Sequence, residues 1–146
     1  VQMAVARGAK VIASASEANL DYLREIGATP VLYGEGVAAR VRAAAGGPVD
    51  AVFDVAGKTP PADLIGVAPE PSQVVTISNF DAPTLGARAT GGGSDSHPVE
   101  TLALTAELLA QNKLVIKVQT FPFERAAEAY HISQAGHVRG KLVLVP

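Results

Sequence analysis

Short apolar segments alternate with helix-like segments along this chain of 146 residues, and the alternation limits the folds that it can adopt. The segments with strand character are 11–16, 30–33, 49–55, 73–78, 85–90 and 141–145, with a further extended stretch at 115–119. Helical periodicity fills 17–26, 36–45, 62–67, 98–112 and 123–134, and residues 1–10 resemble the end of another helix. Strands joined through helices by short connections pair in parallel, so the sequence predicts an α/β protein with a parallel, helix-covered sheet.

Individual residues support these boundaries. Ser16 is a favourable N-cap for the helix at 17–26, Glu17 suits its positive end, and Gly27 is placed to end it. The run Ala51-Val52-Phe53 is apolar on both faces, which predicts a strand that is buried on both sides.

Composition excludes several classes of function. The formal net charge is −2, so the basic surface that nucleic acids or anionic membranes require is absent. The longest apolar runs are far shorter than the ~20 residues of a membrane-spanning helix. The chain has no cysteine, which removes disulfides, thiolate nucleophiles and cysteine-bound zinc. We therefore expect a cytoplasmic protein with neither nucleic-acid nor membrane partners.

Five sequence segments, taken in order, resemble one protein family. They are AVARGAKVIA at 4–13, YLREIGA at 22–28, VLY at 31–33, VDAVFDVAG at 49–57 and GHVRGKLVL at 136–144. Together they make the chain similar to the cofactor-binding part of medium-chain dehydrogenases/reductases, in particular the zinc-free, quinone-oxidoreductase-like branch. The resemblance covers the chain from Val1 to Pro146.

The resemblance implies a Rossmann-like, doubly wound parallel sheet with strand order 3-2-1-4-5-6. In the family, one strand and a Gly-rich turn come immediately before the residues that match Val1. We therefore expect residues 1–146 to be a nucleotide-binding domain that is incomplete at its N-terminus, with 115–146 returning toward an N-terminal substrate domain. A sheet without that strand has a gap between 11–16 and 49–55, and we expect 1–146 alone not to be a stable, cofactor-binding unit.

The end of the strand at 11–16 indicates which cofactor is bound. A site for NAD normally has a carboxylate there, which bonds the ribose 2′-hydroxyl. This chain has Ser14 and Ser16 instead, with Asn19 as a further donor, and these groups suit a 2′-phosphate. The resemblance adds Tyr33 as a contact to that phosphate. The sequence thus predicts NADP(H), while the alternative makes Ser16 only a helix cap and Tyr33 only a half-buried strand end.

Further residues are assigned through the resemblance. The positions expected to line the adenosine and nicotinamide-ribose sides of the cofactor are Val55, Ala56, Gly57, Ile77 and Ser78. Lys141 is expected to reach a cofactor phosphate, or else to be a solvated strand start. Asp54, inside an apolar strand, is interpreted as a structural residue that supports the following loop, and not as half of a catalytic pair with Asp50.

No metal site is expected, because His97, His131 and His137 lack ligand-like spacing. The glycines Gly91-Gly92-Gly93 are interpreted as a flexible loop. No residue of the chain is identified as a catalytic proton donor.

The predicted function is an NADPH-dependent oxidoreductase that transfers hydride from the nicotinamide to a quinone or enone. The alternatives are a relative of zinc-dependent alcohol dehydrogenases and a non-catalytic nucleotide-binding module. Relatives dimerise through the last strand of the sheet, so we expect a homodimer through the strand at 85–90, where Arg88 could instead block pairing.

Overall fold

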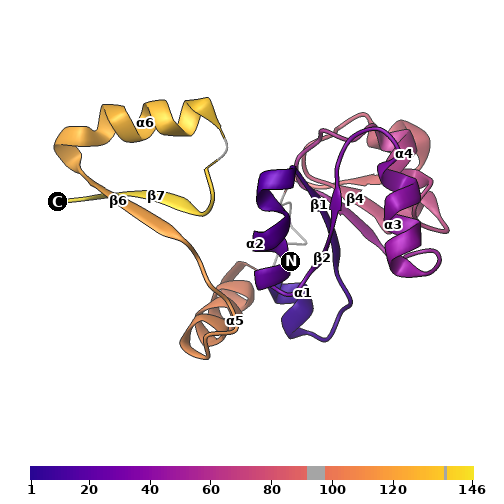
Figure 1. The fold of residues 1–146 in the computed structure, drawn as a ribbon, viewed down its shortest axis with the longest axis horizontal. Coiled ribbons are helices and arrows are strands. Elements are labelled where there is room, and N and C mark those ends of the chain that lie inside the picture. The colour runs from indigo at the N-terminus through magenta and orange to yellow at the C-terminus, as the bar shows by residue number, and fades with distance from the viewer. Residues whose placement is uncertain (92–97, 137) are drawn as a thin grey trace. The chain divides into compact units, whose positions relative to one another are not determined.

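The computed structural model describes residues 1–91, 98–136 and 138–146. They form two compact units, Val1–Thr105 and Ala106–Pro146, and each contains parallel strands and helices (Figure 1). None of the helices in the described residues is long and apolar enough to cross a membrane. The predicted α/β class with parallel pairing is confirmed.

The first sheet of unit 1 contains two parallel strands, β1 (Ile12–Ala15) and β2 (Thr29–Leu32). The chain crosses from β1 to β2 through a 3₁₀ turn and helix α2 (Leu20–Glu25), and leaves β2 into helix α3 (Val37–Ala45). Both helices pack against this sheet, and Figure 1 shows them on opposite sides of the strands. The short helix α1 (Gln2–Ala6) precedes β1.

Gly27 ends the segment that contains α2, as the sequence predicts. Its φ of +87° belongs to the left-handed region, which glycine adopts without steric cost. A Cβ at this position would lie 2.9 Å from Cγ1 of Val5, so a side chain would also collide with α1. The glycine therefore lets the chain turn into β2 close to the Val5 side chain of α1.

The second sheet of unit 1 has the order β3 (Val52–Asp54), β4 (Val74–Thr76), β5 (Arg88–Ala89), all parallel. Helix α4 (Pro61–Ile65) lies in the connection from β3 to β4. Val74 is 1% exposed and centres a small core of buried residues with Ala68, Ala82 and Ala87.

The two sheets correspond to the two halves of the predicted strand order. The predicted order 3-2-1-4-5-6 has strands 3 and 2 on one side of its central strand 1, and strands 4, 5 and 6 on the other side. The pair β2-β1 fits the first group and the three strands β3-β4-β5 fit the second. In the described residues β1 pairs with β2 and β3 pairs with β4, and no ladder joins β1 to β3. This separation agrees with the predicted gap, whereas the instability of residues 1–146 alone stays a prediction.

The structure corrects two sequence predictions in this sheet. The strand predicted at 85–90 is reduced to Arg88–Ala89, because Ala82–Leu85 forms a 3₁₀ helix that Gly86 ends at a φ of +84°. Pro83 has its φ already fixed for that helix. The run Ala51-Val52-Phe53 is also not buried on both sides, since Phe53 is 63% exposed and one edge of β3 pairs with no strand of the described residues.

Unit 2 is a β-α-β arrangement of β6 (Val118–Pro122), helix α6 (Ala126–Ala135) and the parallel strand β7 (Lys141–Val145). Helix α5 (Pro98–Ala110) spans the boundary between the units. The register pairs Val118 with Lys141, and β6 begins three residues after the start of the extended stretch predicted at 115–119. Phe121 of β6 and Ala129 of α6 are both buried.

The turn before α6 carries a surface ion pair. Arg125 forms two hydrogen bonds of 2.6 Å with the carboxylate of Glu128, which lower the pKa of that carboxylate below its usual value. Both side chains are solvent-exposed, so the pair contributes little to stability.

Replacement of Gly140 by alanine is expected to destabilise unit 2. Gly140 has a φ of +89°, and a Cβ there would lie 1.9 Å from the carbonyl oxygen of Lys117, which accepts the first bond of the β6–β7 ladder. We expect Gly140→Ala to lower the unfolding free energy of the intact protein by at least ~3 kcal/mol, measured by denaturant titration. The control Gly46→Ala shares the positive φ but meets no atom within 4 Å, and it should cost only ~1 kcal/mol. Equal losses would show that the clash is relieved at no cost.

Candidate functional site

Asp54 and Thr76 meet at the carboxyl ends of β3 and β4. Asp54 is 7% exposed and Thr76 is fully buried. The Thr76 hydroxyl donates a hydrogen bond of 2.8 Å to Oδ2 of Asp54, and Oδ1 accepts the backbone N–H of Gly57 at 3.0 Å. Oγ1 of Thr76 in turn accepts the N–H groups of Ser78 at 3.1 Å and Asn79 at 3.0 Å.

This network makes Asp54 a structural residue. Both of its carboxylate oxygens are occupied by donors of the chain, which is what keeps a buried carboxylate tolerable. The two oxygen atoms of Asp54 and the hydroxyl of Thr76 fix the backbone that leaves each strand. The interpretation of Asp54 as support for the following loop is confirmed.

The loops after β3 and β4 lie against each other. The Ser78 hydroxyl donates to the carbonyl of Val55, and Gly57, at a φ of +62°, approaches so closely that a Cβ would lie 2.9 Å from Cβ of Ser78. Val55 and Ile77 are 56% and 41% exposed, and Ala56 is exposed as well. The structure thus brings together all five residues predicted here, at the sheet edge where open α/β sheets bind ligands.

The predicted 2′-phosphate residues gather at the carboxyl ends of β1 and β2. The amide of Asn19 donates to Oγ of Ser16 at 3.1 Å, and the N–H of Tyr33 bonds the carbonyl of Ala15 at 3.1 Å. Ser14 lies inside β1 with an exposed side chain. Sequence therefore identified neighbouring residues at one end of the sheet.

The alternative interpretation makes Ser16 only a helix cap and Tyr33 only a half-buried strand end, and the structure differs from it at Ser16. Ser16 stands at the N-cap position, but its side chain makes no capping hydrogen bond, because Oγ accepts the Asn19 amide instead. Tyr33 directly follows β2 and its side chain is 51% exposed, which agrees with the half-buried strand end of the alternative. Oγ of Ser16 thus accepts one hydrogen bond, and about half of the Tyr33 side chain is accessible to solvent.

Arg40 also belongs to this end of the sheet, and sequence reasoning did not single it out. It sits on α3, and its Nε donates to the carbonyl of Leu32 at 2.9 Å. Its Nη2 donates to the carbonyls of Tyr33 and Gly34, each at 3.3 Å. The available signal was an arginine one turn into a helix that follows the turn Gly34-Glu35-Gly36.

The remaining predicted residues lie elsewhere. Lys141 is exposed at the start of β7 in unit 2, where its N–H bonds the Lys117 carbonyl, and its contact with a cofactor stays a prediction. His131 is exposed on α6, whereas His97, His137, Gly92 and Gly93 lie outside the described residues. No group of three or more His, Asp or Glu that could hold a metal occurs in the part of the chain that the structure describes.

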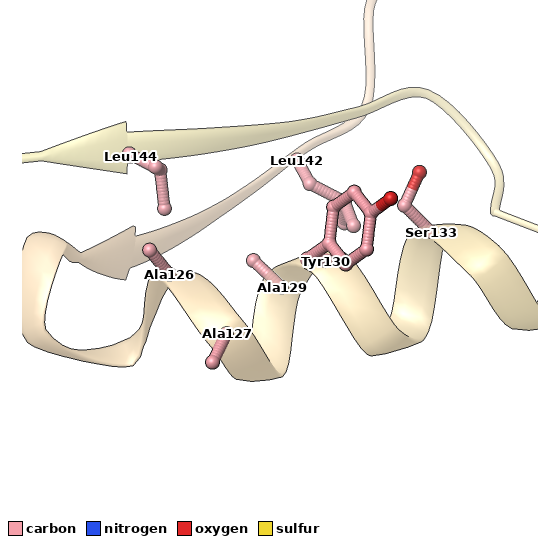
Figure 2. Close-up of a pocket in the computed structure, with 7 residues that line it drawn as sticks. All are labelled: Ala126, Ala127, Ala129, Tyr130, Ser133, Leu142 and Leu144. Carbon is pink, nitrogen blue, oxygen red and sulfur yellow. The ribbon is translucent and has the colours of Figure 1, made fainter.

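Unit 2 contains a shallow groove between α6 and β7 (Figure 2). Seven residues line it: Ala126, Ala127, Ala129, Tyr130, Ser133, Leu142 and Leu144. Only Tyr130 and Ser133 carry side-chain hydroxyls, and no predicted site residue is among the seven. The groove is therefore not the candidate functional site.

Comparison with protein families gives a match over residues 26–144 to the family described as zinc-binding dehydrogenase. The chain belongs to the zinc-binding dehydrogenase family. Membership of a dehydrogenase family implies a nicotinamide cofactor. The resemblance to medium-chain dehydrogenases/reductases is confirmed.

Solved structures of the same fold include several oxidoreductases. A quinone oxidoreductase from Coxiella burnetii is 26% identical over 100% of this chain and 48% of its own, with a TM-score of 0.77. A probable oxidoreductase from Mycobacterium abscessus is 27% identical over 100% of this chain and 49% of its own, with a TM-score of 0.76. An NAD-dependent alcohol dehydrogenase is 25% identical over 99% of this chain and 46% of its own, with a TM-score of 0.79.

The chain therefore spans just under half the length of these structures. A comparison with curated proteins finds no match.

Replacement of Thr76 by valine is expected to destabilise unit 1 strongly. Valine keeps the shape but removes the hydroxyl, so a buried oxygen of Asp54 and the N–H groups of Ser78 and Asn79 lose their partner. We expect a loss of ~3 kcal/mol in unfolding free energy, measured by denaturant titration. Thr84→Val is the matched control, because the Thr84 hydroxyl makes one exposed bond to the Asp81 carbonyl. A loss no larger for Thr76→Val than for the control would contradict the proposed role of the network.

Proposed function

We propose that this chain binds NADP(H), and that the protein containing it reduces a quinone or an enone with hydride from that cofactor. The observation that carries the proposal is the polar group at the ends of β1 and β2. Ser16, Asn19 and Tyr33 present hydroxyl and amide donors there, and β1 itself ends without a carboxylate. Family membership and the similarity to quinone oxidoreductases support the reaction class.

Charge distinguishes the two nicotinamide cofactors at this position. A ribose 2′-hydroxyl is neutral and favours a carboxylate acceptor, whereas a 2′-phosphate is repelled by one and needs donors. Asn19 uses one amide N–H toward Ser16 and retains the other, and the hydroxyl of Tyr33 extends from a half-exposed ring. Ser14 adds an exposed hydroxyl one residue before the end of β1. These groups suit the phosphate.

The second sheet is proposed to hold the rest of the cofactor. The loops at Val55–Gly57 and Ile77–Ser78 are fixed by the bonds to Asp54 and Thr76, and they offer small residues that a ligand can approach closely. Held there, the nicotinamide supplies the hydride to the substrate. The role of the chain is to bind and orient the cofactor. No side chain of this site is assigned as a proton donor.

A zinc-dependent alcohol dehydrogenase is the second candidate, favoured by the family description and by the similarity to an NAD-dependent alcohol dehydrogenase. Elemental analysis separates the two, because that candidate requires stoichiometric zinc in the intact protein. A non-catalytic nucleotide-binding module is distinguished by the lack of quinone-dependent oxidation of bound NADPH.

Replacement of Tyr33 by phenylalanine is expected to weaken NADPH selectively. The variant removes one hydrogen-bond donor to the 2′-phosphate, so the NADPH dissociation constant should rise ~5-fold while that for NADH changes little. Calorimetry on the intact protein measures both constants. Tyr130→Phe, an exposed tyrosine on α6, is the control and should alter neither. Equal affinities of the unmutated protein for NADPH and NADH would refute the cofactor assignment.

We also propose that the protein forms a homodimer through β5. Among the residues that the structure describes, this strand is the edge of the second sheet, and an unpaired edge favours addition of another strand. Thr90 donates its N–H to the Thr76 carbonyl of β4, so the N–H of the preceding Ala89 faces the free edge. Pairing of two copies at this edge would use that donor.

Replacement of Ala89 by proline is therefore expected to weaken the dimer while leaving the β4–β5 ladder intact. We expect the dimer dissociation constant to rise ~10-fold or more, since proline removes the outward N–H, measured by analytical ultracentrifugation. Ala89→Val keeps the N–H and should remain dimeric. A monomeric unmutated protein at micromolar concentration would contradict the proposed dimer.

A further inference from the structure

Hydrogen bonds hold the Arg40 side chain at the end of β2, next to the proposed 2′-phosphate site. Its guanidinium contacts the carbonyl oxygens of Leu32, Tyr33 and Gly34, which are the last residue of β2 and the two that follow. The N–H of Tyr33 bonds the carbonyl of Ala15, directly before Ser16. The positive charge of Arg40 is therefore held at the same sheet end as the hydroxyls of Ser16 and Tyr33.

Two donors of the guanidinium remain available. Arginine has five N–H groups, and three carbonyl bonds occupy Nε and Nη2. The Nη1 group has no hydrogen-bond partner, and Arg40 has no ion pair, among the residues that the structure describes. The three carbonyls orient the guanidinium without neutralising its charge.

Gly36 leaves space beside these donors. It precedes α3 with a φ of +74°, and a Cβ at this position would lie 3.3 Å from Nη1 of Arg40. Any larger residue would crowd the group that is not yet bonded. With glycine at this position, no side chain of residue 36 stands against Nη1.

We infer that Arg40 is the specificity-determining residue for NADP(H), with its guanidinium binding the 2′-phosphate beside Ser16 and Tyr33. This inference rests on the proposed NADP(H) cofactor. A doubly charged phosphate is bound most strongly when a cation joins the neutral donors. The guanidinium of arginine supplies both the positive charge and directed N–H donors. Arg40 supplies the charge that Ser14, Ser16, Asn19 and Tyr33 lack.

The competing role is structural, since the three carbonyl bonds also fasten the turn after β2. A structural role affects both cofactors alike, because the turn borders the adenosine ribose in either case. A role in phosphate recognition affects NADPH alone. The difference between NADPH and NADH is therefore the decisive measurement.

The experiment compares Arg40→Met with Arg42→Met in the intact protein. Both variants remove one arginine from α3, but Arg42 donates to the Gly66 carbonyl, away from the turn that Arg40 contacts. Calorimetry gives dissociation constants for NADPH and NADH at fixed ionic strength. We expect Arg40→Met to raise the NADPH constant ~30-fold and the NADH constant less than ~3-fold, with Arg42→Met below ~3-fold for both.

The outcomes distinguish the inference from the proposal beneath it. If the unmutated protein prefers NADPH and Arg40→Met weakens both cofactors equally, Arg40 only positions the turn and the inference is overturned. If the unmutated protein has no preference for NADPH, the cofactor proposal fails first. Should Arg40→Met not fold, Arg40→Gln keeps amide donors for the carbonyls without the charge, and it is expected to show the same selective loss of NADPH.

Discussion

The buried carboxylate of Asp54 is the constraint on which the second sheet and its site depend. A charged group in an apolar strand is tolerated only if donors surround it, and here the donors are the Thr76 hydroxyl and the Gly57 N–H. The same hydroxyl accepts two N–H groups from the chain after β4. One hydrogen-bond network therefore joins β3 to β4 and also sets the path of both loops. Packing alone would not do this, because the apolar core beside it is small.

The first sheet orders its ligand-binding end in a different way. There the β1–β2 ladder brings Ala15 and Tyr33 together, and Arg40 reaches across from α3 to fasten the turn. The second sheet is held by a buried network of hydrogen bonds around Asp54 and Thr76. In the first sheet, the side chain of Arg40 donates exposed hydrogen bonds to three backbone carbonyls. In both cases the polar groups that hold the backbone stand beside the exposed groups that are proposed to touch the cofactor. Stability and ligand geometry are consequently linked at each sheet end.

The sequence predicted much of the fold because apolar runs and breakers are local signals. Lys141–Val145 is a strand as predicted, and Gly27 ends its helical segment as predicted. The strand predicted at 85–90 is confirmed only at Arg88–Ala89, because the apolar Leu85 lies with Pro83 in a 3₁₀ helix. The prediction for Phe53 was wrong because periodicity shows that a residue is apolar without showing what covers it. The pattern of apolar and helix-breaking residues thus predicted the positions of helices and strands more reliably than the burial of their side chains.

The candidate site shows the same division at the level of single residues. Ser16, Asn19 and Tyr33 were found because they follow strands, and strand ends are visible in sequence. Arg40 was not, because its role depends on a side chain reaching back over eight residues to the Leu32 carbonyl, which no local pattern encodes. The donors predicted from the strand ends, Ser16, Asn19 and Tyr33, include no cation, so they lack the charge that the proposed phosphate site would use. The cation that we propose for cofactor choice belongs to the next helix, one turn into α3, where no strand end points to it.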